Sequence, residues 1–120
     1  MDTIRAIVPL AFLFIVCDAP WLYATSGYAE KMFRKIQGGA PLTVRWTGVP
    51  VVYLALGYLV LQTTSTVQAF MIGLCTYAVY DFTNYSTLGN YELQFAVADS
   101  LWGGVLFSLV REVGLRINLL

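Results

Sequence analysis

Residues 77–90 read YAVYDFTNYSTLGN and follow directly on an apolar run, so the end of a hydrophobic helix carries Asp81 and Asn84. Tyr77, Tyr80, Asp81 and Asn84 are spaced i, i+3, i+4 and i+7, which places all four on one helical face. Hydrocarbon holds no water to solvate a carboxylate, so Asp81 requires a partner. That partner has to come from another segment of the chain.

The composition is typical of a membrane protein. The 120 residues are 58% hydrophobic and 12% charged, whereas soluble domains average about 25% charged residues, and the mean hydropathy is +0.69. The formal net charge is zero and there is no basic tract, which argues against nucleic acid as a partner. The sequence has no His, the commonest general base and metal ligand. At this length we expect residues 1–120 to form one integral membrane domain.

Four segments approach the roughly 20 apolar residues that a membrane-spanning helix needs. We expect these spans at residues 4–23, 42–61, 67–84 and 91–110. The connections between them are short, which predicts an all-α, antiparallel up-down four-helix transmembrane bundle with both termini on one side. The first segment is long and is not followed by a cleavage site of small residues, so we interpret it as a retained span and not as a signal peptide.

The connections and prolines add detail to this topology. Residues 26–37 allow two interpretations, a short interfacial helix or a solvated loop. Pro20 should free a backbone carbonyl near the end of the first span, and Pro50 should kink the second. Cys17 and Cys75 lie in apolar runs without CxxC spacing, so we interpret them as small hydrophobic residues.

The polar residues of all four expected spans converge at one depth. At about 1.5 Å per residue, every one of them falls in the same half of the membrane. The candidates for a ligand- or ion-binding site are Asp18, Arg45, Tyr77, Asp81, Asn84 and Asp99. At the same level we expect an interfacial belt of aromatic residues made of Trp21, Tyr23, Trp46, Tyr85 and Tyr91.

Two interpretations of this polar layer remain open. In the first, Arg45 neutralises one carboxylate, and the other polar groups hold the helices together through hydrogen bonds. In the second, the layer is an intramembrane binding site that opens to one face. Three carboxylates against one Arg leave an excess of negative charge, so either a carboxyl group keeps its proton or a cation binds.

A stripe of small residues recurs every fourth position along the last expected span. It consists of Ala96, Ser100, Gly104 and Ser108. Small residues at this spacing let two helix backbones approach closely, so we expect the stripe to pack against another helix.

Three motifs together resemble a family of predicted four-span membrane proteins, mainly bacterial, that is catalogued as a domain of unknown function. These motifs are Asp18-x-x-Trp21-Leu22, YDFTNYSTL at residues 80–88, and Asp99-x-x-Trp102-Gly103. The resemblance covers nearly the whole chain and implies the same topology and polar positions, but no established activity. It also implies that the termini face inward. The count of Lys and Arg favours the opposite orientation, because the first loop carries Lys31, Arg34 and Lys35 and the usually basic turn at 62–66 is uncharged.

The sequence therefore favours a small transport or ligand-binding protein with a one-sided acidic site that is linked to protons or cations. The alternative is a structural or accessory subunit of a larger membrane complex, in which the polar cluster only fixes helix packing. An enzyme acting on lipid headgroups is less favoured, because His and a Gly-rich phosphate loop are both missing. We expect no cofactor, and the sequence does not indicate whether a metal binds. Besides the lipid bilayer, the candidate partners are a second copy of the chain, which would help to enclose a path because one chain makes a narrow bundle, or a larger membrane complex.

Overall fold

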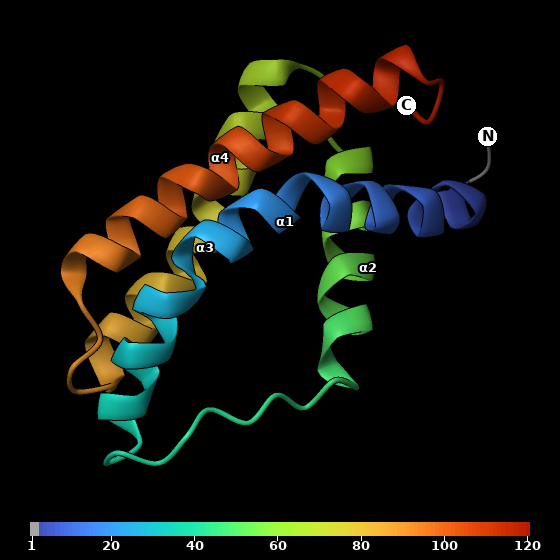
Figure 1. Ribbon diagram of the computed structural model, residues 1–120. Helices are drawn as coiled ribbons and strands as arrows, with labels where there is room; N and C mark the ends of the chain where they lie inside the picture. Colours follow the sequence, from blue (N-terminus) through green and yellow to red (C-terminus); the bar gives the residue numbers. More distant parts are fainter. Residues whose placement is uncertain (1–2) are drawn as a thin grey trace.

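The structure is a computed structural model that describes residues 3–120. Within that range it contains α-helices and no β-strand. The helices are α1 (Thr3–Ile36), α2 (Gly48–Leu61), α3 (Thr66–Thr87) and α4 (Leu93–Arg116) (Figure 1). The expected all-α class and bundle-like packing are confirmed.

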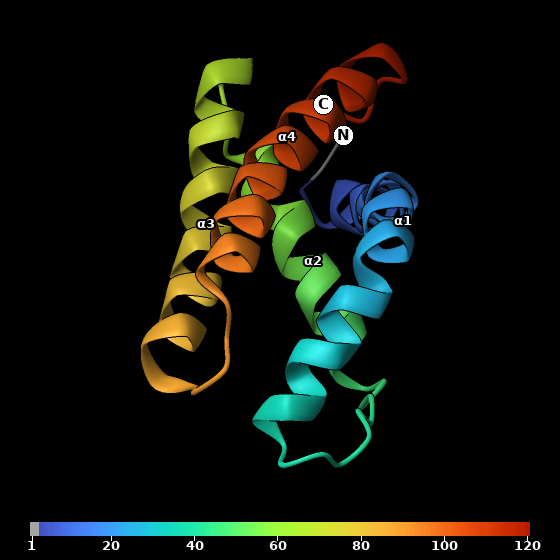
Figure 2. The same ribbon diagram turned by 60° about the vertical axis from the view of Figure 1, so that its left-hand side comes forward.

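The first helix, α1, is one continuous helix of 34 residues, about 51 Å long at 1.5 Å per residue. It includes residues 26–36, so this segment is neither a separate interfacial helix nor a loop. Figure 2 shows α1 changing direction near its middle, where Pro20 lies by sequence and cannot continue the hydrogen-bond ladder. The helix is followed by Gly38 and Gly39, whose φ angles of 68° and 96° suit glycine and strain other residues.

The second helix, α2, is shorter than the expected span at residues 42–61. It begins at Gly48, and residues 40–45 form irregular, exposed chain. Pro50 falls in the first turn of α2, where its missing N–H group has no partner in any helix, so it starts the helix and does not kink it. With 14 residues, α2 is about 21 Å long, which is less than the roughly 30 Å of a bilayer's hydrocarbon core.

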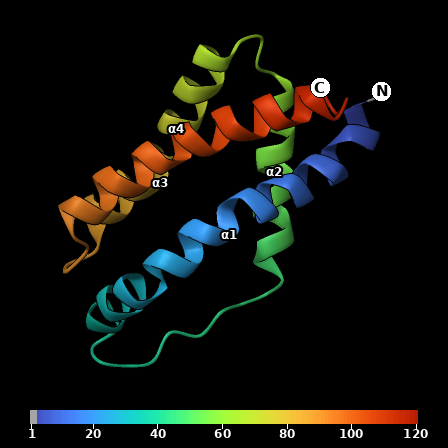
Figure 3. The ribbon, with the colours of Figure 1, turned by 45° about the horizontal axis from the view of Figure 1, so that its top comes forward.

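Each helix packs most closely against one neighbour, α1 against α2 and α3 against α4. Glycines permit both contacts. A Cβ atom at Gly73 would lie only 2.2 Å from the Gly103 carbonyl oxygen, so the α3 and α4 backbones touch. A Cβ atom at Gly57 of α2 would lie 2.9 Å from the Ile7 carbonyl oxygen of α1. Figure 3 shows α2 crossing α1 steeply, whereas α4 runs along α3; contacts between α1 and α4 join the two pairs.

The apolar core lies where the two helix pairs meet. Phe14 of α1 and Phe107 of α4 are fully buried, and their rings pack edge to face with centroids 5.0 Å apart. At one end of the molecule, the beginning of α1, the α2–α3 turn and the C-terminal segment gather, and Arg111 hydrogen-bonds Thr63 there. At the other end Met32 and Tyr91 are buried together. The chain thus runs back and forth between two ends, as expected.

Two of the described helices, α1 and α4, are long and apolar enough to cross a membrane. Large apolar side chains also cover the outside of the molecule, among them Ile4, Phe12 and Val67, which are 77%, 64% and 75% exposed. Water penalises such a surface and hydrocarbon does not. The exterior therefore suits a lipid environment.

Candidate functional site

Asp18 of α1 is held by two donors from other helices. The Tyr53 hydroxyl of α2 donates to its Oδ2 over 2.7 Å, and the Trp102 indole N–H of α4 donates to its Oδ1 over 2.8 Å. Asp18 is only 4% exposed, so without these donors its carboxyl group would lose the hydrogen bonds of water and gain none. One aspartate therefore ties three helices together.

Asp99 and Trp21 form the reciprocal pair. The Trp21 indole N–H of α1 donates to Oδ1 of Asp99 over 3.0 Å. Each Asp-x-x-Trp motif places its two side chains on one helical face, and antiparallel α1 and α4 exchange them. The indole rings of Trp21 and Trp102 stack between the two bonds, with centroids 5.3 Å apart and planes 8° from parallel. We call these four side chains the Asp–Trp clasp.

Asp81 of α3 is the most deeply buried of the three aspartates, with no exposed surface. The Tyr91 hydroxyl donates to its Oδ1 over 2.7 Å. Its other oxygen, Oδ2, is buried and accepts no hydrogen bond from the described residues. The carboxyl group of Asp99 interacts with that of Asp81, so two acidic groups are neighbours and one of them has an oxygen without a donor.

Tyr77 lies near all three carboxyl groups. Its ring packs against Gly103, where a Cβ atom would come within 2.4 Å of the ring. Its hydroxyl group interacts electrostatically with Asp18, Asp99 and Asp81. The structure therefore brings Tyr77 and the three aspartates into one cluster, contributed by α1, α3 and α4.

Asn84 lies at the edge of this cluster. It is half-buried, and it interacts with the phenol groups of Tyr80 and Tyr91. Tyr91 in turn holds Asp81. Asn84 thus interacts with Tyr91, which donates to Asp81. In the described structure Asn84 itself makes no hydrogen bond to Asp81 or Asp99.

The structure does not place Arg45 with the aspartates. Because α2 begins at Gly48, Arg45 lies in the exposed segment before it. No Lys or Arg among residues 3–120 forms an ion pair with Asp18, Asp81 or Asp99. The interpretation in which Arg45 neutralises a carboxylate, one of the two left open above, therefore has no ion pair to support it in the described structure. The donors around the cluster are uncharged indole and phenol groups.

The stripe of small residues in α4 lies partly against α3. Ala96, Ser100 and Gly104 are buried and Ser108 is half-buried. A Cβ atom at Gly104 would come within 2.8 Å of the Phe70 ring of α3. The closest backbone approach, however, involves the neighbouring Gly103, which does not belong to the stripe.

Sequence reasoning missed the residues that donate to the carboxyl groups. Trp21 and Tyr91 were expected in an interfacial belt, yet both point their donor groups at buried aspartates. The repeated Asp-x-x-Trp spacing was a usable signal for Trp21 and Trp102. Nothing in the sequence around Tyr53 distinguishes it from an ordinary apolar helix position.

A helical protein with an apolar exterior and with Asp18, Asp81 and Asp99 enclosed within belongs to the class of membrane proteins. The family model described as predicted membrane protein (DUF2177) matches residues 3–115, so the chain belongs to this family. The resemblance carried by the three motifs is thereby confirmed. No curated protein and no solved structure matches the chain.

Proposed function

We propose that the chain is a small transport or ligand-binding membrane protein whose site is the Asp81–Asp99 carboxyl pair and whose ligand is a proton. One observation carries this proposal: the carboxyl groups of Asp81 and Asp99 are neighbours, and Oδ2 of Asp81 is buried and lacks a donor. A buried acceptor without a donor costs about 1–3 kcal/mol, and more when it is charged. A proton shared between the two carboxyl groups supplies the missing hydrogen bond and removes one charge.

The surroundings favour a proton over a metal cation. Among residues 3–120 there is no group of three or more carboxylate, thiol or imidazole side chains arranged to hold a metal ion. Asp18 uses both oxygens to accept hydrogen bonds from Tyr53 and Trp102. Asp99 accepts one from Trp21 through Oδ1. The oxygens left for a ligand are too few for the six or so that hard divalent cations take.

The membrane arrangement belongs to the same proposal. All four helices cross or enter the bilayer, and Asp18, Asp81 and Asp99 lie within one half of it. The supporting observations are the lengths of α1 and α4 and the apolar exterior. In this arrangement the bilayer thins locally around α2, which is shorter than the hydrocarbon core. Ionisable residues within membrane helices commonly mark proton or ion pathways.

Proton flux into proteoliposomes tests the proposal. The purified protein is reconstituted with a pH-sensitive dye inside the vesicles, and a potassium diffusion potential drives proton entry. We expect the wild type to acidify the lumen, and Asp81→Asn to abolish at least nine-tenths of its flux above empty vesicles. Asn retains an acceptor for Tyr91 but cannot exchange a proton.

Glu30→Gln is the matched control, because it also removes one carboxylate, from an exposed position where Glu30 only pairs with Arg34. It should leave the flux unchanged. Wild-type flux in the Asp81→Asn, Asp99→Asn double variant would overturn the proposal, as would wild-type flux no greater than that of empty vesicles.

A second candidate function rests on the Asp–Trp clasp. Two reciprocal hydrogen bonds and stacked indoles lock α1 to α4, which is what an accessory subunit with a purely structural polar cluster requires. This function predicts a stoichiometric membrane partner after gentle solubilisation and the loss of that partner in Asp18→Asn. Recovery of a stable lone species with normal proton flux would exclude it.

A further inference from the structure

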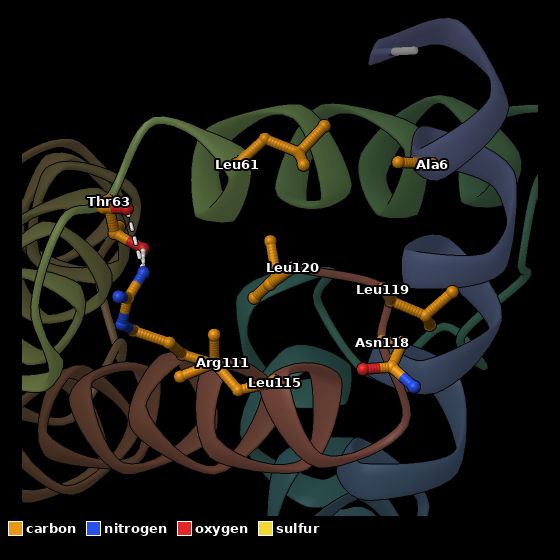
Figure 4. Close-up of a pocket in the computed structure, with 8 residues that line it drawn as sticks. All are labelled: Ala6, Leu61, Thr63, Arg111, Leu115, Asn118, Leu119 and Leu120. Carbon is orange, nitrogen blue, oxygen red and sulfur yellow. Dashed lines mark hydrogen bonds between the residues drawn. The ribbon is translucent and has the colours of Figure 1, made fainter. Parts of the chain in front are cut away.

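A cavity of about 360 Å³ lies near the end of α4, roughly three helical turns beyond Asp99. It does not touch the aspartate cluster or any residue of the proposed proton site. Figure 4 shows its lining, which comes from the start of α1, the end of α2, the turn that follows, α4 and the C-terminal segment. The lining residues are Ala6, Leu61, Thr63, Arg111, Leu115, Asn118, Leu119 and Leu120.

Arg111 is oriented at one end of this cavity by Thr63. Its Nη1 donates to the Thr63 carbonyl oxygen over 2.7 Å and to Thr63 Oγ1 over 2.9 Å. The Thr63 hydroxyl is itself fixed, because it donates its proton to the Val60 carbonyl oxygen over 2.6 Å. The guanidinium group is therefore held by hydrogen bonds from one nitrogen, Nη1.

The opposite edge of the guanidinium group is unused. The Nε atom of Arg111 is buried and has no hydrogen-bond partner in the described structure. No described carboxylate pairs with Arg111, since the adjacent Glu112 accepts from Thr66 instead. Nε and Nη2 form the flat edge that binds two oxygens of one carboxylate side by side. A buried donor without a partner at this edge points to an oxyanion ligand, which contacts Nε once the guanidinium group rotates toward the cavity.

Apart from Arg111, Thr63 and Asn118, the lining residues of the cavity are apolar. Figure 4 shows Leu61 and Leu120 facing its middle, with Ala6, Leu119 and Asn118 at the end away from Thr63. The volume lies in the range of small-molecule sites, which are mostly apolar with a few placed polar groups. A phospholipid headgroup would set its own polar groups against these leucines at a cost. A hydrocarbon tail has no polar groups and would pack against the leucines without this cost.

We propose that this cavity binds a single-chain amphiphilic carboxylate, such as a medium-chain fatty acid. The carboxylate pairs with the Nε–Nη2 edge of Arg111, and the chain lies among the leucines toward Asn118. The ligand leaves the Asp81–Asp99 pair untouched, so this site stands or falls separately from proton flux.

Equilibrium dialysis with radiolabelled octanoate tests the site on the full chain in phosphatidylcholine nanodiscs, with empty nanodiscs subtracted. We expect saturable binding of one octanoate per chain. Arg111→Lys keeps the charge but loses the flat edge, and should weaken binding about tenfold. Leu115→Trp fills the cavity with Arg111 intact and should weaken binding equally. Arg116→Lys is the matched control, since Arg116 is exposed in the last turn of α4, and should bind like the wild type.

Three results would overturn the proposal. Octanoate affinity unchanged by both Arg111→Lys and Leu115→Trp would show that octanoate binds elsewhere. Equal displacement by 1-octanol would show that the guanidinium group recognises no carboxylate. Loss of octanoate binding in phosphatidylglycerol nanodiscs would identify a lipid phosphate as the occupant. If Arg111→Lys does not fold, as judged by gel filtration and circular dichroism, Thr63→Val serves in its place, because it removes the hydroxyl that orients Nη1.

Discussion

Trp102 satisfies a buried carboxyl group without bringing a second charge into the protein. An indole N–H only donates, and the rest of the ring is a large apolar surface. It can therefore reach Asp18 across the contact between α4 and α1 while its ring stacks on Trp21. An ammonium or guanidinium donor in the same place would carry its own desolvation penalty.

Trp102→Phe should lower the free energy of unfolding by about 1–2 kcal/mol, because one buried carboxylate hydrogen bond is lost and most of the ring packing remains. Unfolding by titration with a denaturing detergent, followed by circular dichroism, measures the change. Trp46→Phe makes the same substitution where the side chain is 73% exposed and should change stability by less than about 0.5 kcal/mol. Equal losses in the two variants would show that the indole hydrogen bond contributes nothing particular.

At this scale, part of the candidate site could be predicted and part could not. Counting residues along helices placed Asp18 and Asp99 at similar depth, and the structure puts both in one cluster. Opposite charge is the obvious complement of a carboxylate, so the sequence favours Arg45 as a partner, although Arg45 lies in the exposed segment before α2. The indole and phenol donors could not be predicted, because in the sequence a residue such as Trp21 cannot be distinguished from an ordinary interfacial aromatic residue.

At the scale of elements, glycine determines how closely α3 and α4 approach. The carbonyl oxygen of Gly103 occupies the place that a side chain at Gly73 would need. Tyr77, one turn along α3 from Gly73, fits against Gly103 of α4. The close approach of the two helices keeps Asp81 of α3 next to Asp99 of α4. The carboxyl pair therefore depends on the spacing of the two helices.

Gly73→Ala should push α3 and α4 apart and cost about 1–3 kcal/mol or more, because backbone cannot move aside as a flexible side chain can. The same detergent titration measures it. Gly27→Ala is the matched control, since a Cβ atom at this position of α1 meets nothing within 4 Å and alanine favours a helix by about 1 kcal/mol over glycine. Gly27→Ala should be neutral or stabilising. A Gly73→Ala protein as stable as the wild type would contradict the contact.

Helix existence was predictable from apolar runs, but helix ends were not. Hydropathy predicts a second span from residue 42, whereas α2 begins at Gly48. The two differ because apolar character does not reveal whether the residues before a proline are helical. The charged residues after Tyr28 favoured either a short interfacial helix or a solvated loop, separate from the first span. They continue α1 instead, since Lys and Arg are good helix formers and Gly38 is the first residue that stops it.

At the scale of the whole molecule, the proposed four-span arrangement puts the two ends of the helix bundle on opposite faces of a membrane. Cysteines introduced at Gln62 and Arg116 should react with a membrane-impermeant maleimide from one face. Cysteines at Ala40 and Ser86 should react from the other. The background carries Cys17→Ala and Cys75→Ala, because both native cysteines are free thiols. Labelling of all four sites from one face would refute the four-span arrangement. The same labelling experiment determines the orientation, on which the family resemblance and the count of Lys and Arg disagree.

The central claim is that Asp81 and Asp99 share a proton inside the folded protein. Infrared spectroscopy of the reconstituted protein at neutral pH tests it most directly, because a protonated carboxyl group absorbs apart from a carboxylate. We predict a protonated-carboxyl band in the wild type that moves in D₂O, persists in Glu30→Gln and disappears in the Asp81→Asn, Asp99→Asn double variant. A wild-type spectrum without such a band, or one whose band survives in the double variant, would contradict the claim.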